Sequence, residues 1–220
     1  MNSQTEENYL KAIFYLTYQV ENWASTTALA ERLKTKASSI TDMVQKLAEK
    51  GFVDYKKYQG VRLTVNGKKI ALGIIRKHRL WEVFLVEKLD FKWDEVHEIA
   101  EQLEHIQSKD LTDRLDAFLD FPKFDPHGDP IPDIDGNLVE HAQSISLDNL
   151  QKAERGIVVG VNDSNDHFLR FLDEHALVLG VKLTVLDIFP YDGSMRIKVG
   201  KEEKSLSHKV AKNLFVQRAS

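Results

Sequence analysis

Four residues that can bind a metal ion recur at helical spacing near the middle of the chain: His97, Glu101, Glu104 and His105. On an α-helix they fall within one arc about 100° wide. Two imidazoles and two carboxylates on one face suit a divalent cation such as Mn²⁺, Fe²⁺ or Zn²⁺. The same spacing is also common on solvated or salt-bridged helix faces, so the pattern alone leaves both interpretations open.

A second pair of this kind, His78 and Glu82, lies four residues apart in the preceding helical segment. Because the chain has no cysteine, any metal site must use nitrogen and oxygen ligands, and disulfides are excluded. Solitary histidines usually have no metal role, so we expect strap or surface positions for four others: His127, His141, His175 and His208.

Charge is distributed unevenly along the 220 residues, although the net charge is only −4. Residues 1–79 carry 14 Lys and Arg against 7 Asp and Glu, whereas residues 80–151 carry 5 against 18. A basic front half suits a polyanionic partner, and an acidic middle suits cations. The sequence has no run of 18 apolar residues and no leader pattern, so we expect a cytoplasmic protein without a membrane partner.

The elements before the first histidine pair predict a DNA-binding domain over residues 1–72. Apolar spacing predicts three helices and then two short strands, over about residues 4–20, 26–33, 37–50, 52–55 and 61–64. Thr26 or Thr27 would cap the second helix, and Gly51 would end the third. Three helices followed by a basic two-stranded wing are typical of a winged helix-turn-helix.

In such a domain the third helix enters the major groove, and the wing meets the phosphate backbone. The early outward positions of that helix, which could contact phosphates or base edges, are Lys36, Ser38, Ser39, Thr41 and Asp42. The basic wing residues are Lys56, Lys57 and Arg62. The Ser-Ser-x-Thr run could instead be a helix N-cap, and the wing lysines a solvated surface.

The rest of the chain predicts a helical middle domain over residues 73–140 and a β-rich domain over residues 150–220. A long helix from Asn66 to about Leu89 would be followed by helices over residues 93–106 and 109–120. Residues 121–136 hold four of the five prolines, which indicates a linker or an extended strap. Three later strand-like runs and one short helix at 166–175 fit a small β-barrel, so the fold class is mainly α with small β.

Six sequence motifs together resemble one known family. They are Asn8-Tyr9-Leu10-Lys11-Ala12-Ile13-Phe14, Ser38-Ser39-Ile40-Thr41-Asp42-Met43-Val44, Leu63-Thr64-x-x-Gly67, Arg76-Lys77-His78-Arg79-Leu80-x-Glu82, His97-x-x-x-Glu101-x-x-Glu104-His105 and Pro126-His127-Gly128-Asp129-Pro130-Ile131-Pro132. In these motifs, over nearly the full length, the chain resembles the diphtheria toxin repressor family of metal-dependent transcription regulators. Its long form ends in an SH3-like, FeoA-type domain.

The resemblance implies two metal sites between the DNA-binding and dimerisation regions. The primary site would use Asn8, Glu101, Glu104 and His105. The ancillary site would use His78, Glu82 and His97, completed by a residue of the C-terminal domain, for which Asp163, Asp166 and His167 are candidates. Manganese-type members carry acidic residues at the positions of Asn8 and Lys11; Glu6 and Glu7 lie nearby, but out of helix phase with the matched position.

The resemblance further implies a homodimeric repressor that binds a double-stranded DNA operator when Mn²⁺ or Fe²⁺ is bound, and that controls metal homeostasis genes. Dimer contacts could come from apolar positions that could equally be monomer core: Val96, Ile99, Leu103, Leu111, Leu115 and Phe118. One alternative is a winged-helix regulator that senses a small organic ligand. A metal-dependent hydrolase is a weaker alternative, because no HExxH, GxSxG or P-loop motif occurs, so we expect no enzyme.

Overall fold

The computed structural model describes residues 2–18, 23–139 and 144–219. The chain divides into two compact units, each containing separate stretches of sequence. Unit 1 contains residues 1–78, 102–108 and 132–137, and unit 2 contains residues 79–101, 109–131 and 138–220. Within the described residues, no helix is both long and apolar enough to cross a bilayer.

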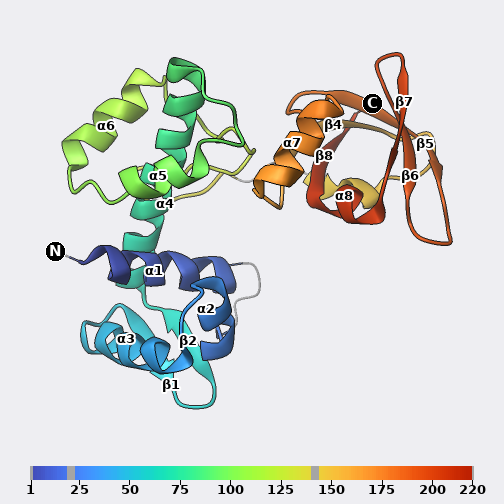
Figure 1. The fold of residues 1–220 in the computed structure, drawn as a ribbon. Helices are drawn as coiled ribbons and strands as arrows, with labels where there is room; N and C mark the ends of the chain where they lie inside the picture. The colour runs from blue at the N-terminus through green and yellow to red at the C-terminus, as the bar shows by residue number, and fades with distance from the viewer. Residues whose placement is uncertain (1, 19–22, 140–143, 220) are drawn as a thin grey trace. The chain divides into compact units, whose positions relative to one another are not determined.

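Unit 1 contains the predicted winged helix-turn-helix. Its helices are α1 (Gln4–Thr17), α2 (Thr26–Arg32) and α3 (Ala37–Glu49), and the antiparallel strands β1 (Val53–Lys56) and β2 (Gly60–Leu63) form the wing (Figure 1). Ser3 and Glu6 form a capping box at the start of α1. The cap of α2 is Ser25, whose side chain accepts from the Ala28 amide, so neither Thr26 nor Thr27 caps it.

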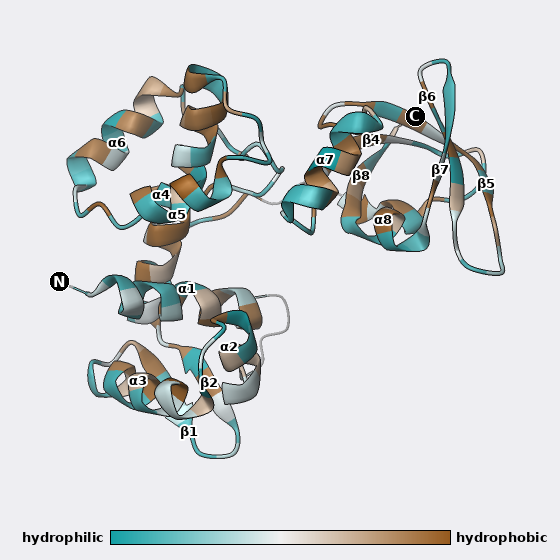
Figure 2. Ribbon diagram, viewed as in Figure 1, coloured by the Kyte–Doolittle hydropathy of each residue, from teal (hydrophilic) through white to brown (hydrophobic). Residues whose placement is uncertain are grey.

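All three helices of this domain contribute to one apolar core. Leu10, Ile13, Leu29, Ile40 and Leu47, which come from all three helices, are fully buried, so each helix contributes one apolar face. The β1–β2 loop is hydrophilic, as its teal colour in Figure 2 shows. This leaves the outer face of α3 and the wing loop available for a polar partner.

Helix α4 (Val65–Leu89) contains the long helix predicted from Asn66, and it begins one residue earlier. Helix α5 (His97–Leu103) is much shorter than the predicted helix over residues 93–106, and α6 (Lys109–Phe118) follows it. Residues 93–96 form turns and a bend, and Glu104 and His105 lie in a turn beyond the end of α5. The four metal-binding residues therefore do not share one helix face as expected. The helical spacing ends at Leu103, so only His97 and Glu101 lie on α5.

The proline-rich strap over residues 121–136 is extended and turn-rich, as the sequence predicted. The Asp125 carboxylate accepts hydrogen bonds from the backbone amides of His127 and Asp129, which shapes its central turn. Two arginines of α4 hold the strap through backbone carbonyls: Arg76 donates to that of Pro132 and Arg79 to that of Pro130. The strap is thereby an ordered part of the structure.

The C-terminal domain contains one six-stranded antiparallel sheet in the order β3-β8-β4-β5-β6-β7. Its elements are β3 (Ser144–Ser146), the 3₁₀ turn η1 (Leu147–Asn149), β4 (Arg155–Val161), α7 (Asp166–Glu174), β5 (Lys182–Ile188), β6 (Met195–Val199), β7 (Glu202–Leu206), α8 (His208–Asn213) and β8 (Leu214–Ala219). The predicted closed barrel is wrong in this respect, because β3 and β7 are the edges of the sheet. Register shifts in β4 and β5 bend the strands without closing the sheet.

Candidate metal sites and nucleic-acid surface

Glu104 is the centre of a buried polar cluster in unit 1. Its side chain has no solvent exposure, and both of its oxygens have a nitrogen partner. Lys11 Nζ lies 2.6 Å from Oε1 and 2.8 Å from Oε2, and His78 Nδ1 lies 2.6 Å from Oε2. The three residues come from α1, α4 and the turn after α5, so this carboxylate joins the DNA-binding domain to the helical segments behind it.

Electrostatics keep Glu104 ionised despite its burial. Burial alone would raise the pKa of its carboxyl group, but the hydrogen bond from His78 and the charge of Lys11 outweigh that effect and hold the pKa below its ordinary value. An anionic carboxylate with no solvent around it is a strong ligand for a divalent cation. The Lys11 ammonium supplies a positive charge at this position.

A second carboxylate, that of Glu7, lies beside the predicted ligand His105. Glu7 Oε2 is 2.6 Å from His105 Nδ1, and Glu7 Oε1 accepts a hydrogen bond of 2.6 Å from Gln107 Nε2. The neighbouring Asn8 is exposed. The structure therefore brings Glu7, and not Asn8, against His105, because adjacent residues on α1 point about 100° apart.

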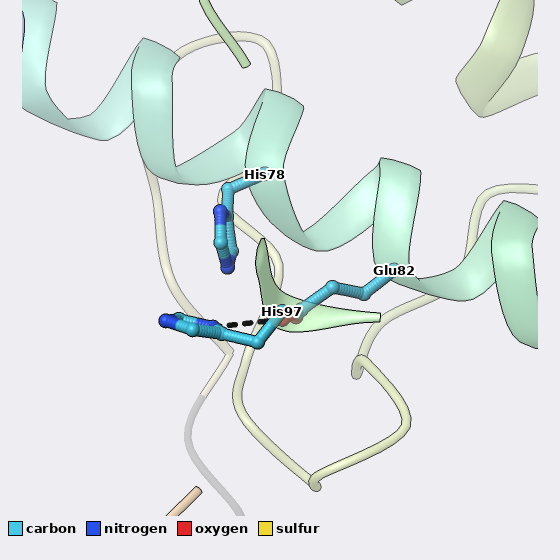
Figure 3. A group of neighbouring side chains, drawn as sticks. All are labelled: His78, Glu82 and His97. Carbon is cyan, nitrogen blue, oxygen red and sulfur yellow. Dashed lines mark hydrogen bonds and ion pairs between the residues drawn. The ribbon is translucent and has the colours of Figure 1, made fainter. Parts of the chain in front are cut away.

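The predicted ligands of the ancillary site lie together. His78 and Glu82 are one turn apart on the continuous helix α4, and His97, at the start of α5, reaches the same Glu82 (Figure 3). Each of the three residues offers one ligand atom, and these atoms lie within 4.8 Å of one another. His97 Nδ1 is 3.4 Å from Glu82 Oε1. Two imidazoles and a carboxylate at this separation could hold one divalent cation.

Glu101 lies with His97 and not with the Glu104 cluster. Its carboxylate is half exposed and lies 3.7 Å from His97 Nε2, which matches their spacing on α5. Helix α5 ends before Glu104, so Glu101 and Glu104 do not share a helix face. The structure therefore places Glu101 apart from Glu104 and His105, with which the resemblance grouped it.

The candidate ligands from the C-terminal domain lie at the start of α7. Asp166 and His167 are exposed, and the Asp163 carboxylate accepts from the Asn165 amide. Within the residues that the structure describes, neither group of potential metal ligands includes a residue of this domain.

Glu82 also belongs to a second, fully buried group with Asp125 and His127 of the strap. Burial opposes the charged form of His127, but the facing carboxylates of Glu82 and Asp125 raise the pKa of its imidazole to about 9. Burial and the negative charge of Glu82 raise the pKa of Asp125 to about 7. His127 lies in the strap, one of the two positions expected for it, and is buried there; His141 lies outside the described residues.

The predicted DNA-contact residues lie on the outer side of α3 and on the wing. Those that are exposed are Lys36, Ser38, Ser39, Asp42, Lys56, Lys57 and Arg62. Thr41 is half-buried, and its hydroxyl donates to the Ala37 carbonyl of its own helix. The N-cap position of α3 is Lys36, without a side-chain cap bond, so the serines are inside the helix and do not cap it.

The wing cations are fixed by neighbours of the same domain. The indole of Trp23 lies under both Lys56 Nζ, at 5.0 Å from the ring centre, and the Arg62 guanidinium, at 4.8 Å. Asp54 accepts a 3.0 Å hydrogen bond from Arg62 Nε, which offsets part of that charge. Lys56 and Lys57 are therefore the wing residues best able to neutralise phosphates.

Comparisons with known proteins match nearly the full length of the chain. Residues 1–61 match the family described as iron dependent repressor, N-terminal DNA binding domain, and residues 64–133 match its metal binding and dimerisation domain. Residues 145–218 match the FeoA domain. A solved manganese-dependent transcriptional repressor in complex with manganese is 36% identical, with a TM-score of 0.87 over 97% of this chain and all of that one. The chain belongs to this repressor family.

Two further relatives of this family differ in the metal that their names give. The manganese regulator SloR is 33% identical, with a TM-score of 0.78 over 97% of this chain and 98% of that one. The iron-dependent repressor IdeR of Mycobacterium leprae is 28% identical over 97% of each chain. The family predicted from the sequence motifs is confirmed, and these relatives include both iron- and manganese-dependent repressors.

Proposed function

We propose that the protein is a homodimeric, metal-activated repressor that binds a DNA operator in response to Mn²⁺ or Fe²⁺ and controls metal homeostasis genes. The observation that carries this proposal is the buried Glu104 carboxylate, at which α1, α4 and the turn after α5 meet. An ion bound there would fix α1 and the recognition helix packed with it. We expect this function in the cytoplasm and without enzymatic activity.

The primary site that the geometry favours uses Glu7, Glu104 and His105. Two carboxylates and one imidazole are ligands that suit Mn²⁺ and Fe²⁺, and the set contains no thiolate. Lys11 would leave Glu104 when the ion binds, since a protonated amine cannot be a ligand. Asn8 and Glu101 are both exposed and would join this site only after a rearrangement.

The ancillary site that we propose uses His78, Glu82 and His97. Because Nδ1 of His78 contacts Glu104, we assign its Nε2 to the ion. This imidazole would then link the two sites, since a carboxylate on one nitrogen orients the other toward a metal. Asp166 or His167 would complete the coordination only if the start of α7 approached the site.

Exposed apolar residues around α6 support the homodimer. Leu111 and Phe118 of α6 are exposed, Phe118 to 64%, and Phe121 follows at 55%. Phe84 of α4 lies beside Phe118, with the ring centres 6.2 Å apart. By contrast, Val96 is fully buried and Leu115 is nearly so, and both therefore belong to the core of the monomer. We propose that a second copy of the chain covers these phenylalanines, so that one dimer carries the two recognition helices that a two-fold operator requires.

Metal-dependent DNA binding of matched variants tests the proposal. A duplex selected from a random library with and without Mn²⁺ serves as the DNA, and fluorescence anisotropy measures binding after chelation and after addition of Mn²⁺ or Fe²⁺. We expect Glu104→Gln and His105→Ala to lose the metal response, while Glu98→Gln, an exposed change on α5, keeps it. Tight binding by the chelated wild type would contradict the proposal and favour a regulator of the organic-ligand class.

A further inference from the structure

The buried strap histidine His127 belongs to unit 2, together with Glu82 and His97 of the ancillary site and with the C-terminal domain. Its Nε2 lies 2.8 Å from the backbone carbonyl of Trp93, so this nitrogen carries the hydrogen and donates. The ring also stacks on Trp93, with centres 6.1 Å apart and planes 18° apart. These two contacts fix the direction in which the other nitrogen points.

That other nitrogen, Nδ1, faces Glu82. It lies 3.7 Å from Glu82 Oε2, while Glu82 Oε1 lies 3.4 Å from Nδ1 of His97. Each oxygen of Glu82 therefore has a different imidazole beside it. The half-exposed His97 is on one side, and the buried His127 is on the other.

The backbone around His127 contacts strand β4 of the C-terminal domain. The His127 carbonyl accepts a 3.0 Å hydrogen bond from the Val161 amide. Gly128 has φ +88°, and a Cβ there would lie 2.1 Å from the Val159 carbonyl oxygen, so only glycine permits this approach. A shift of β4 would therefore move the strap turn and with it the His127 ring.

The segment before His97 is held by the same domain. Trp93 is part of the apolar core formed by the strands and helices of the C-terminal domain. Asp94 Oδ2 accepts a 2.7 Å hydrogen bond from Arg170 Nε on α7. Both Glu82, through His127, and His97, through residues 93–94, are thus connected to this domain without a ligand from it.

We propose that His127 is a positioning residue that orients Glu82 for the metal and couples the ancillary site to the C-terminal domain. This inference rests on the proposed site at His78, Glu82 and His97. Asp125, the third member of the buried group, holds the strap turn: its carboxylate accepts from two backbone amides and lies 3.5 Å from Arg79 Nε. Residues that orient metal ligands typically contribute 10- to 100-fold to metal affinity.

Two substitutions separate positioning from packing. His127→Asn keeps an amide near the place of Nδ1, facing Glu82, whereas His127→Gln keeps one near the place of Nε2, facing Trp93. Calorimetric titration of the full chain with Mn²⁺ measures each binding event, and His97→Ala identifies the ancillary one. We expect His127→Gln to weaken that event about 10- to 100-fold and His127→Asn to retain it within a few-fold.

The opposite order, with Gln retaining affinity and Asn losing it, would overturn the proposal and leave His127 a role in packing on Trp93. Equal affinity in wild type and both variants would also overturn it. If His97→Ala removes no binding event, the proposed ancillary site itself fails, which distinguishes that failure from a failure at His127.

Hydrogen exchange of the unaltered protein tests the coupling without any variant. We expect Mn²⁺ to slow exchange of the Val161 amide, which donates to His127, relative to the chelated protein. Unchanged exchange at Val161, when Mn²⁺ is bound at the ancillary site, would refute the coupling to the C-terminal domain. This measurement remains decisive even if both His127 variants fold poorly.

Discussion

Replacing Lys11 with methionine should lower the free energy of unfolding of the chelated protein and raise its affinity for Mn²⁺. The Lys11 ammonium lies 2.6 and 2.8 Å from the two oxygens of the fully buried Glu104. Methionine keeps most of the length of the side chain and removes its charge. In the variant, the buried carboxylate would retain the His78 hydrogen bond but lose the ammonium charge until an ion binds.

The expected size follows from the burial of this pair. Removing one partner of a buried ion pair typically costs about 3–5 kcal/mol, because the other charge is left uncompensated. The remaining His78 contact and the slight exposure of Lys11 reduce this to about 2 kcal/mol. If the ion replaces the ammonium, the metal-bound state avoids this cost, so Mn²⁺ affinity should rise about thirtyfold, at 1.4 kcal/mol per tenfold.

Two measurements on the same samples check this prediction. Chemical denaturation of chelated protein gives the free energy of unfolding, and calorimetric titration gives the affinity for Mn²⁺. Lys77→Met is the matched control, because Lys77 is a nearby, half-buried lysine of α4 whose Nζ contacts the Ile106 carbonyl. The control should change Mn²⁺ affinity by much less than Lys11→Met does.

A particular result would refute the reasoning. If Lys11→Met destabilises the metal-free protein but leaves Mn²⁺ affinity unchanged or lower, then the ammonium does not compete with the ion. Glu104 would in that case bind metal with Lys11 still in place, and the proposed displacement would be wrong.

Two other predictions concern the DNA-binding domain and the dimer. Lys50 and Lys46 lower the pKa of Glu6 to about 2, so Glu6→Gln should reduce the free energy of unfolding by about 1–2 kcal/mol at pH 7. That difference, measured by urea denaturation, should shrink as the pH falls from about 4.5 towards 2, because the wild-type carboxylate then protonates; a pH-independent difference would contradict the ion-pair explanation. Phe118→Asp should weaken the homodimer at least about 30-fold in sedimentation experiments, since it places a charge in the proposed apolar contact. An unchanged dimer would place the interface elsewhere.

The winged domain was predicted well from the sequence, because apolar periodicity and helix-ending residues depend only on neighbouring positions. Apolar periodicity located α1 to α3, and Gly51, with φ +71°, lies just beyond α3 as expected. The C-terminal domain was predicted less completely. Strands β3, β7 and β8 and helix α8 were missed, since β3 has only three residues and β7 (Glu202–Leu206) is mostly charged. Edge strands of this kind carry little apolar alternation, so their place depends on pairing with distant strands.

Among the site residues, the ligands on continuous helix were predicted best. His78 and Glu82 are one turn apart on α4, so their common face follows from spacing alone. Glu7 was rejected on helix phase, yet it belongs to the buried face of α1 with Leu10 and Phe14, three and seven residues later. That apolar stripe could have indicated that Glu7, and not the exposed Asn8, points inward.

The end of α5 explains why one metal-binding pattern becomes two clusters. His97 and Glu101 are on the helix, where His97 contacts Glu82 and Glu101 lies beside His97, whereas Glu104 and His105 follow its last residue and contact α1. A longer helix would have put all four on one face, and a single site could not have contacted both α1 and the strap. Because α5 ends at Leu103, His78 can connect the two proposed sites. Its Nδ1 contacts Glu104, and it lies in the same group as Glu82 and His97. If both proposed sites bind metal, occupancy of one should change the affinity of the other through this imidazole.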